Sequence, residues 1–409
     1  YNDLIDQYVV EEEKAGFRAD VLAWYALADG KTYAYPNYAY SEDDLPEGKG
    51  LIPNRCIVVR ADMYEQLGSP DMSSPEAFLD ACERAMTEIG TYNDLPVIGI
   101  QLYENGNEAY DIVSSYFAVP WETEDGHAYN AWANGANKET YAFLNEAYRR
   151  GLILESNYAD TRDQVREKIA NGRVFALIAA PQDFYNEFVT LYEADPNAYY
   201  IPVELRNANG DEPVLGDISG WGYLQTAISA NCKAPDRLIQ FISYLVNDEG
   251  AIHMNYGWEG EHWEWNEDGT ISITDEYRAA LAEDPTMNKQ LGIACFDLFA
   301  NAAFLMQFAA PLDLEDPVDL RTYRCSDTYI KEPMAVYSHR PAQYKYDPND
   351  SRALTVSEEN LKLESYTQIA IAELLTADSP EAFEAKYTEI QTTIPTLYDQ
   401  ELVLAYNDD

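Results

Sequence analysis

The residues with the most distinctive chemistry in this chain are aromatic and acidic side chains crowded between residues 254 and 273. Three of the seven tryptophans, Trp258, Trp263 and Trp265, fall within eight residues there, interleaved with glutamates and His262. Indole rings cover the apolar faces of flat ligands, and carboxylates accept hydrogen bonds from hydroxyl groups. These residue types suit a platform for a ligand rich in hydroxyls, although the same rings would also serve to anchor a hairpin to a helix.

The spacing of these residues predicts a β-hairpin. From residue 261 onward the side chains alternate, so that Trp263 and Trp265 share one face of a strand. Asp268-Gly269 is a turn signal because both residue types adopt positive φ, and residues 270–273 then alternate again. A strong helix predicted over 235–247, with Gly250 as its C-cap, leads into the hairpin.

Catalytic signatures are absent from the sequence. There is no glycine-rich nucleotide loop, no Gly-x-Ser-x-Gly nucleophile elbow and no His-Glu-x-x-His zinc motif. The four histidines are scattered, at His127, His253, His262 and His339. Neither a metal centre nor a histidine-based triad therefore has support. The 72 acidic residues leave a glycosidase with paired carboxylates open, but no spacing singles out an acid and a nucleophile.

One segment has part of a calcium-loop spacing. Its positions one, three, five and twelve are Asp347, Asn349, Ser351 and Glu358. The sixth position, which needs glycine for a sharp turn, is Arg352. We therefore expect a solvated acidic loop here rather than a metal site, and we expect no cofactor.

The composition limits the classes of partner. There are 27 Lys and Arg against 72 Asp and Glu, which gives a net charge of −45. Such a field repels phosphates and anionic lipids, so nucleic acid is excluded and neutral or cationic ligands remain. Tyrosine is abundant, with 33 Tyr against 13 Phe, and its apolar face with a polar tip suits a wet surface that grips a ligand. An acidic exported protein that tolerates Tyr on its surface would explain part of this excess.

Length and patterning predict the architecture. A chain of 409 residues is longer than one core supports, so we expect two lobes. Apolar runs at 56–60, 97–102 and 173–179 alternate with amphipathic helical patterns, which indicates α/β units with sheets covered by helices. The last third is expected to be mainly helical, with a Pro- and Asp-rich connection over 311–349 and helices over 274–283, 298–308, 357–375 and 380–392.

An ordered set of motifs runs through the chain. KAPD at 233–236 opens a helix and YGWEGEHW at 256–263 follows it, before the Asp-Gly hairpin. Upstream lie DGKTYAYP at 29–36, VRADMYEQLG at 59–68, YRRGLI at 148–153 and KIANGR at 168–173. In this order the motifs closely resemble extracellular solute-binding proteins of ABC transporters, in the carbohydrate-type, lipoprotein-like branch of Gram-positive bacteria. The resemblance covers essentially the whole chain.

The resemblance implies a fold and a domain plan. The fold is expected to be α/β, two-lobed and periplasmic-binding-protein-like (type II), with lobes joined by crossing strands and a helical C-terminal part. Residues 1–55 and 216–297 would form the first lobe, 56–215 the second, and 298–409 a helical region packing on both lobes. The family's export signal, lipid-anchored cysteine and opening strand–helix units would lie upstream of Tyr1, so we expect the first lobe to be truncated.

The resemblance also implies a ligand held in a cleft between the lobes. The expected contacts are aromatic and polar residues of the matching segments, namely Tyr35, Tyr38, Tyr110, Trp121, Gln182, Phe184, Trp221, Tyr256 and Glu259. Trp221 is the leading candidate, because the glycines that flank it clear space beside its ring. The tryptophans of the predicted hairpin are then better interpreted as its anchors.

These observations predict a non-catalytic component of an ABC importer. It would be a monomeric, extracellular lipoprotein that captures an oligosaccharide and presents it to the permease subunits in the membrane. Two alternatives stay open at this stage. One is a secreted glycoside hydrolase with an acidic cleft, and the other is a surface adhesion module whose hairpin binds another protein.

Overall fold

The computed structural model describes residues 1–39, 52–103, 106, 108–124, 127, 129–216, 222–293, 295, 299–300, 309–339 and 351–407. They form two compact units. The first unit is drawn from residues 1–51 and 218–320, and the second from residues 52–217 and 321–409. The C-terminal region expected over 298–409 is therefore divided between the two units at residue 320.

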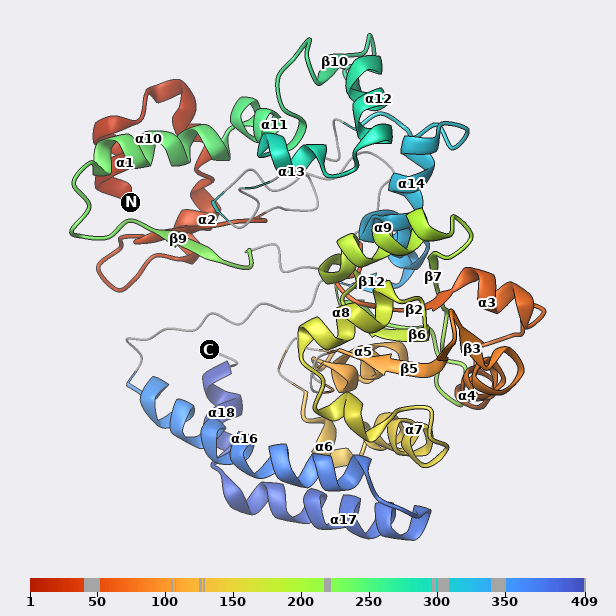
Figure 1. Ribbon diagram of the computed structural model, residues 1–409. Helices are drawn as coiled ribbons and strands as arrows, with labels where there is room; N and C mark the ends of the chain where they lie inside the picture. Colours follow the sequence, from red (N-terminus) through yellow and green to blue (C-terminus); the bar gives the residue numbers. More distant parts are fainter. Residues whose placement is uncertain are drawn as a thin grey trace. The chain divides into compact units, whose positions relative to one another are not determined.

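The first unit is mainly helical (Figure 1). Its strands β1 (Ala34–Pro36) and β9 (Gln225–Ala227) pair antiparallel, with Tyr35 opposite Thr226. Buried side chains of the N-terminal helices and α10 share one core with Tyr35 of β1. The helices of this unit are α1 (Asn2–Tyr8), α2 (Ala19–Trp24), α10 (Pro235–Val246), α11 (Asp248–Tyr256), α12 (Asp275–Glu283), α13 (Met287–Leu291) and the first part of α14 (Pro317–Cys325).

The predicted hairpin is confirmed in the first unit. β10 (Trp263–Trp265) and β11 (Ile271–Ile273) pair antiparallel, and Gly269 in the turn has φ +80°. Trp263 is buried against Ile252 and Ile271, and its indole N–H donates to the carbonyl oxygen of Gly257 at 2.8 Å. Trp263 therefore anchors the hairpin to a helix, as the sequence predicts, but that helix is α11, which follows the helix predicted over 235–247.

The second unit is built on a four-stranded mixed sheet in the order β5–β6–β2–β7. β5 and β6 are parallel, whereas β2 runs antiparallel to both β6 and β7. Every residue of β2, β5 and β6 is buried, which explains why these segments are near-continuous apolar runs in the sequence. The strands are β2 (Cys56–Arg60), β5 (Ile98–Leu102), β6 (Val174–Ala179) and β7 (Tyr200–Pro202).

Helices pack against this sheet and extend from it (Figure 1). They are α3 (Ala61–Gln66), α4 (Pro75–Arg84), α5 (Ala109–Tyr116), α6 (Ala131–Asn134), α7 (Lys138–Arg149), α8 (Arg162–Ala170), α9 (Tyr185–Ala194), α15 (Asp327–Lys331), α16 (Ala353–Leu375), α17 (Pro380–Leu397) and α18 (Gln400–Asn407). A short parallel pair, β8 (Leu215–Gly216) and β12 (Ser338–His339), and the small hairpin β3 (Thr91–Tyr92) and β4 (Leu95–Pro96) complete the unit. No helix among the described residues is long and apolar enough to cross a membrane.

Local sequence explains where several helices begin. Ser74 caps α4 by accepting a hydrogen bond from the first turn, and Pro75 occupies the first helical position. Ser379 caps α17 in the same way. Thr161 and Gln164 form a capping box at the start of α8, in which each side chain bonds the other residue's backbone N–H.

Two expectations about helices in the sequence are wrong. Gly250 does not close α10 but lies inside α11, where a Cβ atom would come within 1.9 Å of the carbonyl oxygen of Tyr244. Glycine is therefore needed for the close approach of α11 to the end of α10. The segment 311–349 is not a plain connection, because it contains α14, α15 and a 3₁₀ turn at Glu332–Tyr337. Most of the helix expected over 298–308 lies outside the described residues.

A column of aromatic rings fastens α17 to the rest of the second unit. Tyr110 of α5 stacks on Tyr141 of α7 with ring centroids 4.6 Å apart. Trp132 continues the column, at 5.1 Å from Tyr141 and 5.3 Å from Tyr387 of α17. The Tyr387 hydroxyl also donates to Oδ1 of the buried Asn137 at 2.6 Å. Tyr387 thus contributes both ring packing and a buried hydrogen bond to the attachment of α17.

Replacing Tyr387 with Leu is expected to lower the free energy of unfolding by about 2–4 kcal/mol, because the ring stack and the buried hydrogen bond are both lost. Urea unfolding followed by circular dichroism measures this change. The control Tyr223→Leu removes a ring that is 72% exposed and should cost less than about 0.5 kcal/mol. Equal losses in the two variants would contradict the assigned role of the column.

Candidate functional site

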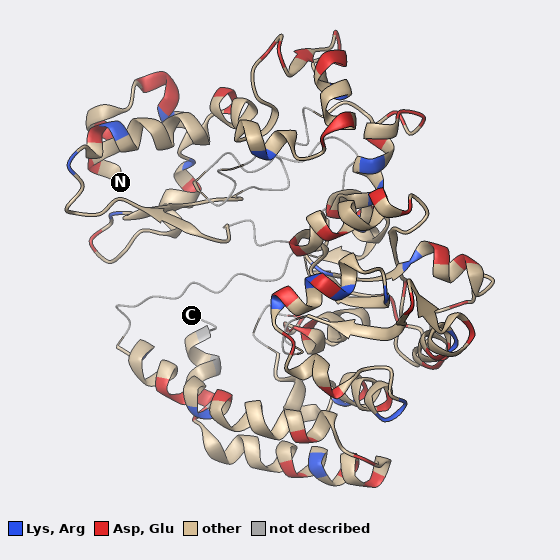
Figure 2. Ribbon diagram, viewed as in Figure 1, with Lys and Arg blue, Asp and Glu red and all other residues tan. Residues whose placement is uncertain are grey.

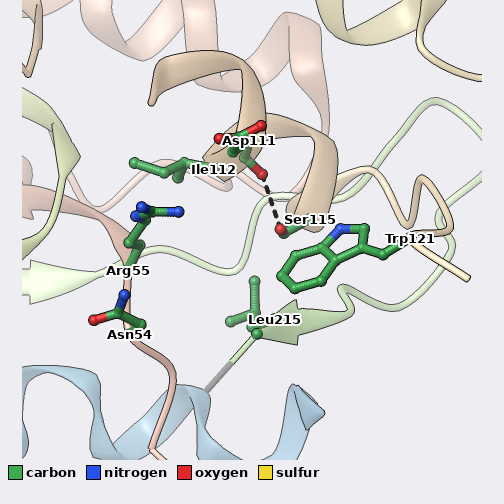
Figure 3. Close-up of a pocket in the computed structure, with 8 residues that line it drawn as sticks. Asn54, Arg55, Asp111, Ile112, Ser115, Trp121 and Leu215 are labelled. Atoms are coloured by element: carbon green, nitrogen blue, oxygen red, sulfur yellow. Dashed lines mark hydrogen bonds between the residues drawn. The ribbon is translucent and has the colours of Figure 1, made fainter. Parts of the chain in front are cut away.

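A cavity of about 110 Å³ lies within the second unit, where the residues before β2 meet α5 and β8 (Figure 3). Its lining combines an indole ring and aliphatic side chains with a carboxylate, a guanidinium, an amide and a hydroxyl group. These are the contacts that a polyhydroxylated ligand needs, because such a ligand has both apolar faces and polar edges. The lining residues are Asn54, Arg55, Asp111, Ile112, Ser115, Trp121, Leu215 and Gly216.

Close backbone packing sets the place of Trp121 at this cavity. A Cβ atom at Gly216 would lie 2.2 Å from Cη2 of the Trp121 ring, so a side chain at this position would displace the indole. The backbone N–H of Asn54 donates to the carbonyl oxygen of Gly216 at 2.9 Å and joins the segment before β2 to β8. Trp121 is 38% exposed and lies beside Ser115 and Leu215 (Figure 3). Part of its ring therefore stays open to a ligand.

Polar groups of opposite character face the cavity. Arg55, before β2, supplies hydrogen-bond donors, and its Nε lies 2.9 Å from Oε2 of Glu108. On α5, the Ser115 hydroxyl donates to the carbonyl oxygen of Asp111 at 2.8 Å, which leaves its lone pairs as acceptors (Figure 3). Burial raises the pKa of the Asp111 carboxyl; the positive charge of Arg55 lowers it in part and the negative charge of Glu108 raises it further.

Two of the residues predicted from the sequence belong to this site. Trp121 lines the cavity directly. Gln182, in the 3₁₀ turn Pro181–Phe184 after β6, lies one hydrogen bond behind it, because its Nε2 donates to Oδ1 of Asn54 at 2.8 Å. The structure thus brings together residues that are 128 positions apart in the chain.

Three predicted aromatic residues are engaged in packing. Tyr35 is buried in β1, its hydroxyl accepts the backbone N–H of Arg18 at 3.0 Å, and burial raises its pKa to about 12. Phe184 is fully buried and meets Tyr103 edge-to-face at 5.9 Å. Tyr110 has one face covered by the ring column. Neither Tyr35 nor Phe184 has surface to offer a ligand here, because their rings complete the cores of the two units.

The other predicted contacts do not line the cavity. Tyr38 follows β1 and is half-buried with φ +53°. Tyr256 is half-buried at the end of α11, where it packs on the cluster around Trp263, and Glu259 is exposed just beyond it. All three belong to the first unit. Trp221, the leading candidate from the sequence, lies outside the described residues.

The first unit has a larger hollow, of about 470 Å³, beside the Trp-rich stretch. Trp258 borders it, is 59% exposed, and lies against His253 with ring centroids 4.7 Å apart. Most of its other lining residues are aliphatic or aromatic, and Glu261 is the one carboxylate among them. Several of its polar groups are already engaged: the Tyr244 hydroxyl bonds Nδ1 of His253 at 2.6 Å, and Nδ1 of His262 accepts the backbone N–H of Trp258 at 2.9 Å. The cavity at Trp121, with both a guanidinium and a carboxylate in its lining, is therefore the better candidate for a polyol.

Sequence reasoning missed most of the polar lining of the Trp121 cavity. Asp111 and Ser115 are four positions apart, a spacing that places them on the same face of a helix. Asn54 and Arg55 directly precede the buried run of β2. These two signals were present in the sequence, but nothing local indicates that the two segments meet.

Metal binding has no support among the described residues, where no three His, Cys, Asp or Glu side chains are grouped to hold an ion. Two positions of the calcium-loop spacing, Asp347 and Asn349, lie outside the described residues. Ser351 precedes α16, Glu358 lies within it, and Arg352 is the N-cap residue of that helix.

Comparison with known proteins gives both a family and a fold. Residues 4–252 match the family described as bacterial extracellular solute-binding protein. The fold is similar to that of the alginate-binding protein AlgQ2 without calcium ion, at 15% identity and a TM-score of 0.64, covering 99% of this chain and 80% of that one. It is also similar to an HMO-binding solute-binding protein from Bifidobacterium longum infantis, at 13% identity and a TM-score of 0.66, covering 99% of this chain and 81% of that one. A third similar structure is Streptococcus pneumoniae FusA in complex with kestose, at 15% identity and a TM-score of 0.63, covering 99% of this chain and 82% of that one.

At these identities the likeness to solved structures shows the fold alone. It confirms the predicted α/β, type II periplasmic-binding-protein-like class. No curated protein matched the sequence.

The raised pKa of Asp111 predicts a pH-dependent effect on stability. A carboxyl whose pKa is raised by folding stabilises the protein at low pH, and this contribution is lost as pH rises through the folded-state pKa. Asp111→Asn, which cannot ionise, should therefore be more stable than the wild type at pH 7, with a difference that shrinks towards pH 4. Thermal unfolding at both pH values measures the difference.

Asp71→Asn is the matched control with the opposite sign. Hydrogen bonds from the backbone and side chain of Ser73 lower the pKa of Asp71, so this residue stabilises the protein at neutral pH. The variant should be less stable than the wild type at pH 7 and should approach it in acid. The same sign of change in both variants would contradict the assigned environment of Asp111.

Proposed function

The chain belongs to the family of bacterial extracellular solute-binding proteins, and on that premise we propose that it captures a neutral oligosaccharide for an ABC importer. The observation that carries the proposal is the family match, which extends over residues 4–252. That the ligand is a saccharide is supported by proteins of the same fold, which include an alginate-binding protein, an HMO-binding protein and FusA in complex with kestose. Alginate is anionic and kestose is neutral, so these neighbours support the saccharide class and not its charge.

The chemistry of the Trp121 cavity supports a sugar. A pyranose or furanose ring presents C–H groups on its faces and hydroxyl groups at its edge. The exposed part of the Trp121 indole suits such a face, whereas Arg55 and Asp111 suit the hydroxyl edge.

The charge of the protein favours a neutral ligand. Figure 2 shows that Asp and Glu residues are distributed over helices of both units, in keeping with the net charge of −45. A field of this sign lowers the local concentration of anions. An uncharged saccharide is not subject to that repulsion, and its affinity should depend little on ionic strength.

The protein binds its solute without transforming it. Members of the matched family are binding components of importers rather than enzymes. The glycoside hydrolase alternative has no support. Among the described residues that line the candidate cavity, Asp111 is the only carboxylate, and the nearby Glu108 is paired with Arg55.

The partners and location follow from the proposed role. We propose that the protein acts outside the cell, held at the membrane by a lipid anchor, and that it works as a monomer. The two transmembrane permease subunits of the importer would then take the sugar from it. Phosphate-rich partners such as nucleic acid are disfavoured by the net charge.

Isothermal titration calorimetry of the purified chain tests the ligand class. The probes are four neutral oligosaccharides (kestose, maltotriose, cellotriose and lacto-N-tetraose) and, as the competing class, trialanine. Micromolar or tighter binding of at least one saccharide, with no products on prolonged incubation, is expected. Binding of the peptide alone would overturn the proposal.

Trp121→Ala is expected to weaken binding of the tightest saccharide in that panel by about 10- to 100-fold, because the apolar platform is lost. Trp265→Ala is the matched control, since this exposed tryptophan belongs to the hairpin of the first unit and is not among the residues that line the cavity. Calorimetry of both variants measures the effect. Unchanged affinity in Trp121→Ala, or an equal loss in Trp265→Ala, would place the sugar elsewhere.

A further inference from the structure

A buried ammonium group lies behind the Trp121 cavity. Lys331 of α15 is 2% exposed, and its Nζ lies 2.9 Å from Oδ2 of Asp327. The same nitrogen donates to Oε1 of Gln182 at 3.0 Å and to the carbonyl oxygen of Asn54 at 3.4 Å. The three protons of the ammonium group thus have three acceptors, drawn from α15, the turn after β6 and the segment before β2.

The charge of Lys331 determines how the Gln182 amide is oriented. An ammonium group only donates hydrogen bonds, so the atom of Gln182 that faces it has to be the oxygen. The Nε2 of Gln182 then points the other way and donates to Oδ1 of Asn54 at 2.8 Å. The reverse orientation would bring N–H groups against the ammonium at one contact and two acceptor oxygens together at the other, which costs two buried hydrogen bonds.

The orientation of Gln182 in turn fixes that of the Asn54 amide, which lines the cavity. Because Oδ1 of Asn54 accepts from Gln182, its Nδ2 is the group left for a ligand. Figure 3 draws the amide nitrogen of Asn54 on the side of Arg55 and the amide oxygen pointing away from Trp121. The hydrogen bonds from Lys331 to Gln182 and from Gln182 to Asn54 form a chain, called the relay below. In the relay the ammonium sets the orientation of the first amide, the first amide sets that of the second, and Nδ2 of Asn54 remains as a donor at the cavity.

We propose that Lys331 and Gln182 are positioning residues that hold Asn54 as a hydrogen-bond donor and thereby help to set ligand specificity. The inference rests on the proposed function and extends it to a particular contact. The ligand atom at Asn54 has to be an acceptor, such as a hydroxyl or ring oxygen. A group that only donates, such as the ammonium of an amino sugar, is disfavoured at this point.

The donor at Asn54 is matched by acceptors on the opposite side of the cavity lining. Asn54 and Arg55 present donors from one side of the cavity, whereas Asp111 and Ser115 present acceptors from α5. A hydroxyl group accepts from the first side through its lone pairs and donates its proton to the second. A cavity with donors and acceptors separated in this way recognises hydroxyl groups and selects against groups of a single polarity.

The variant Gln182→Glu reverses the relay. A carboxylate at this position only accepts, so it would bond Lys331 with one oxygen and the Nδ2 of Asn54 with the other. The oxygen of Asn54 would then face the cavity. We expect the tightest saccharide among kestose, maltotriose, cellotriose and lacto-N-tetraose to bind at least about tenfold more weakly by calorimetry.

Two further variants separate this effect from a general disturbance. Asn54→Asp keeps the acceptor for Gln182 but places an oxygen at the cavity, so it should weaken binding in the same way without touching Lys331. Gln164→Glu adds the same charge to the second unit, yet Glu preserves the capping box of α8, so its affinity should stay at the wild-type value. Wild-type affinity in both Gln182→Glu and Asn54→Asp would overturn the proposal.

Neutron diffraction from deuterium-exchanged crystals of the ligand-free protein tests the relay independently of any sugar. The expected map places the two Nδ2 deuterons of wild-type Asn54 towards the cavity and turns them towards position 182 in Gln182→Glu. Deuterons of Asn54 directed at Gln182 in the wild type would refute the relay. If no saccharide binds, the proposed function fails, while this map still decides the orientation.

Discussion

The candidate site depends on one physical constraint, which is that a buried positive charge must have all its hydrogen bonds satisfied. Lys331 meets this condition by bonding three separate segments of the second unit. Removing any one acceptor would leave a desolvated charge partly unpaired. The segments that carry Asp327, Gln182 and Asn54 are therefore held in one arrangement. We infer that the buried charge of Lys331 sets the orientation of the Asn54 amide at the cavity wall through Gln182.

Rigid elements support the remaining contacts of the cavity. Arg55 directly precedes a fully buried strand, and Asp111 and Ser115 project from a single helix that packs on the same sheet. The Trp121 ring fits against Gly216 because that residue has no side chain, and the Trp121 carbonyl oxygen accepts the backbone N–H of Tyr129 at 2.9 Å. A site built on the ends of strands and helices in this way is ordered before a ligand arrives, which lowers the entropic cost of binding.

The sequence predicted the elements of the fold better than the site. Strands such as 56–60 and 173–179 were recognisable because both faces are buried, and the hairpin because Asp268-Gly269 follows an alternating strand. Binding residues were harder, because Tyr and Phe serve core packing and ligand contact equally well: Tyr35 and Phe184 turned out to complete cores. Lys331 gave only the signal of its spacing to Asp327, four positions away on one helix, since its other two partners lie 149 and 277 positions away in the chain.

The central claim is that a neutral saccharide binds against Trp121, and fluorine NMR tests it most directly. The chain is labelled with 5-fluorotryptophan, each of the seven tryptophan signals is assigned by Trp→Phe substitution, and kestose, maltotriose, cellotriose and lacto-N-tetraose are titrated in turn. The account predicts a saturable shift of the Trp121 signal, with the signals of Trp258, Trp263 and Trp265 unmoved. A saturable shift of Trp258 with an unchanged Trp121 signal would contradict it, because the sugar would then occupy the hollow of the first unit.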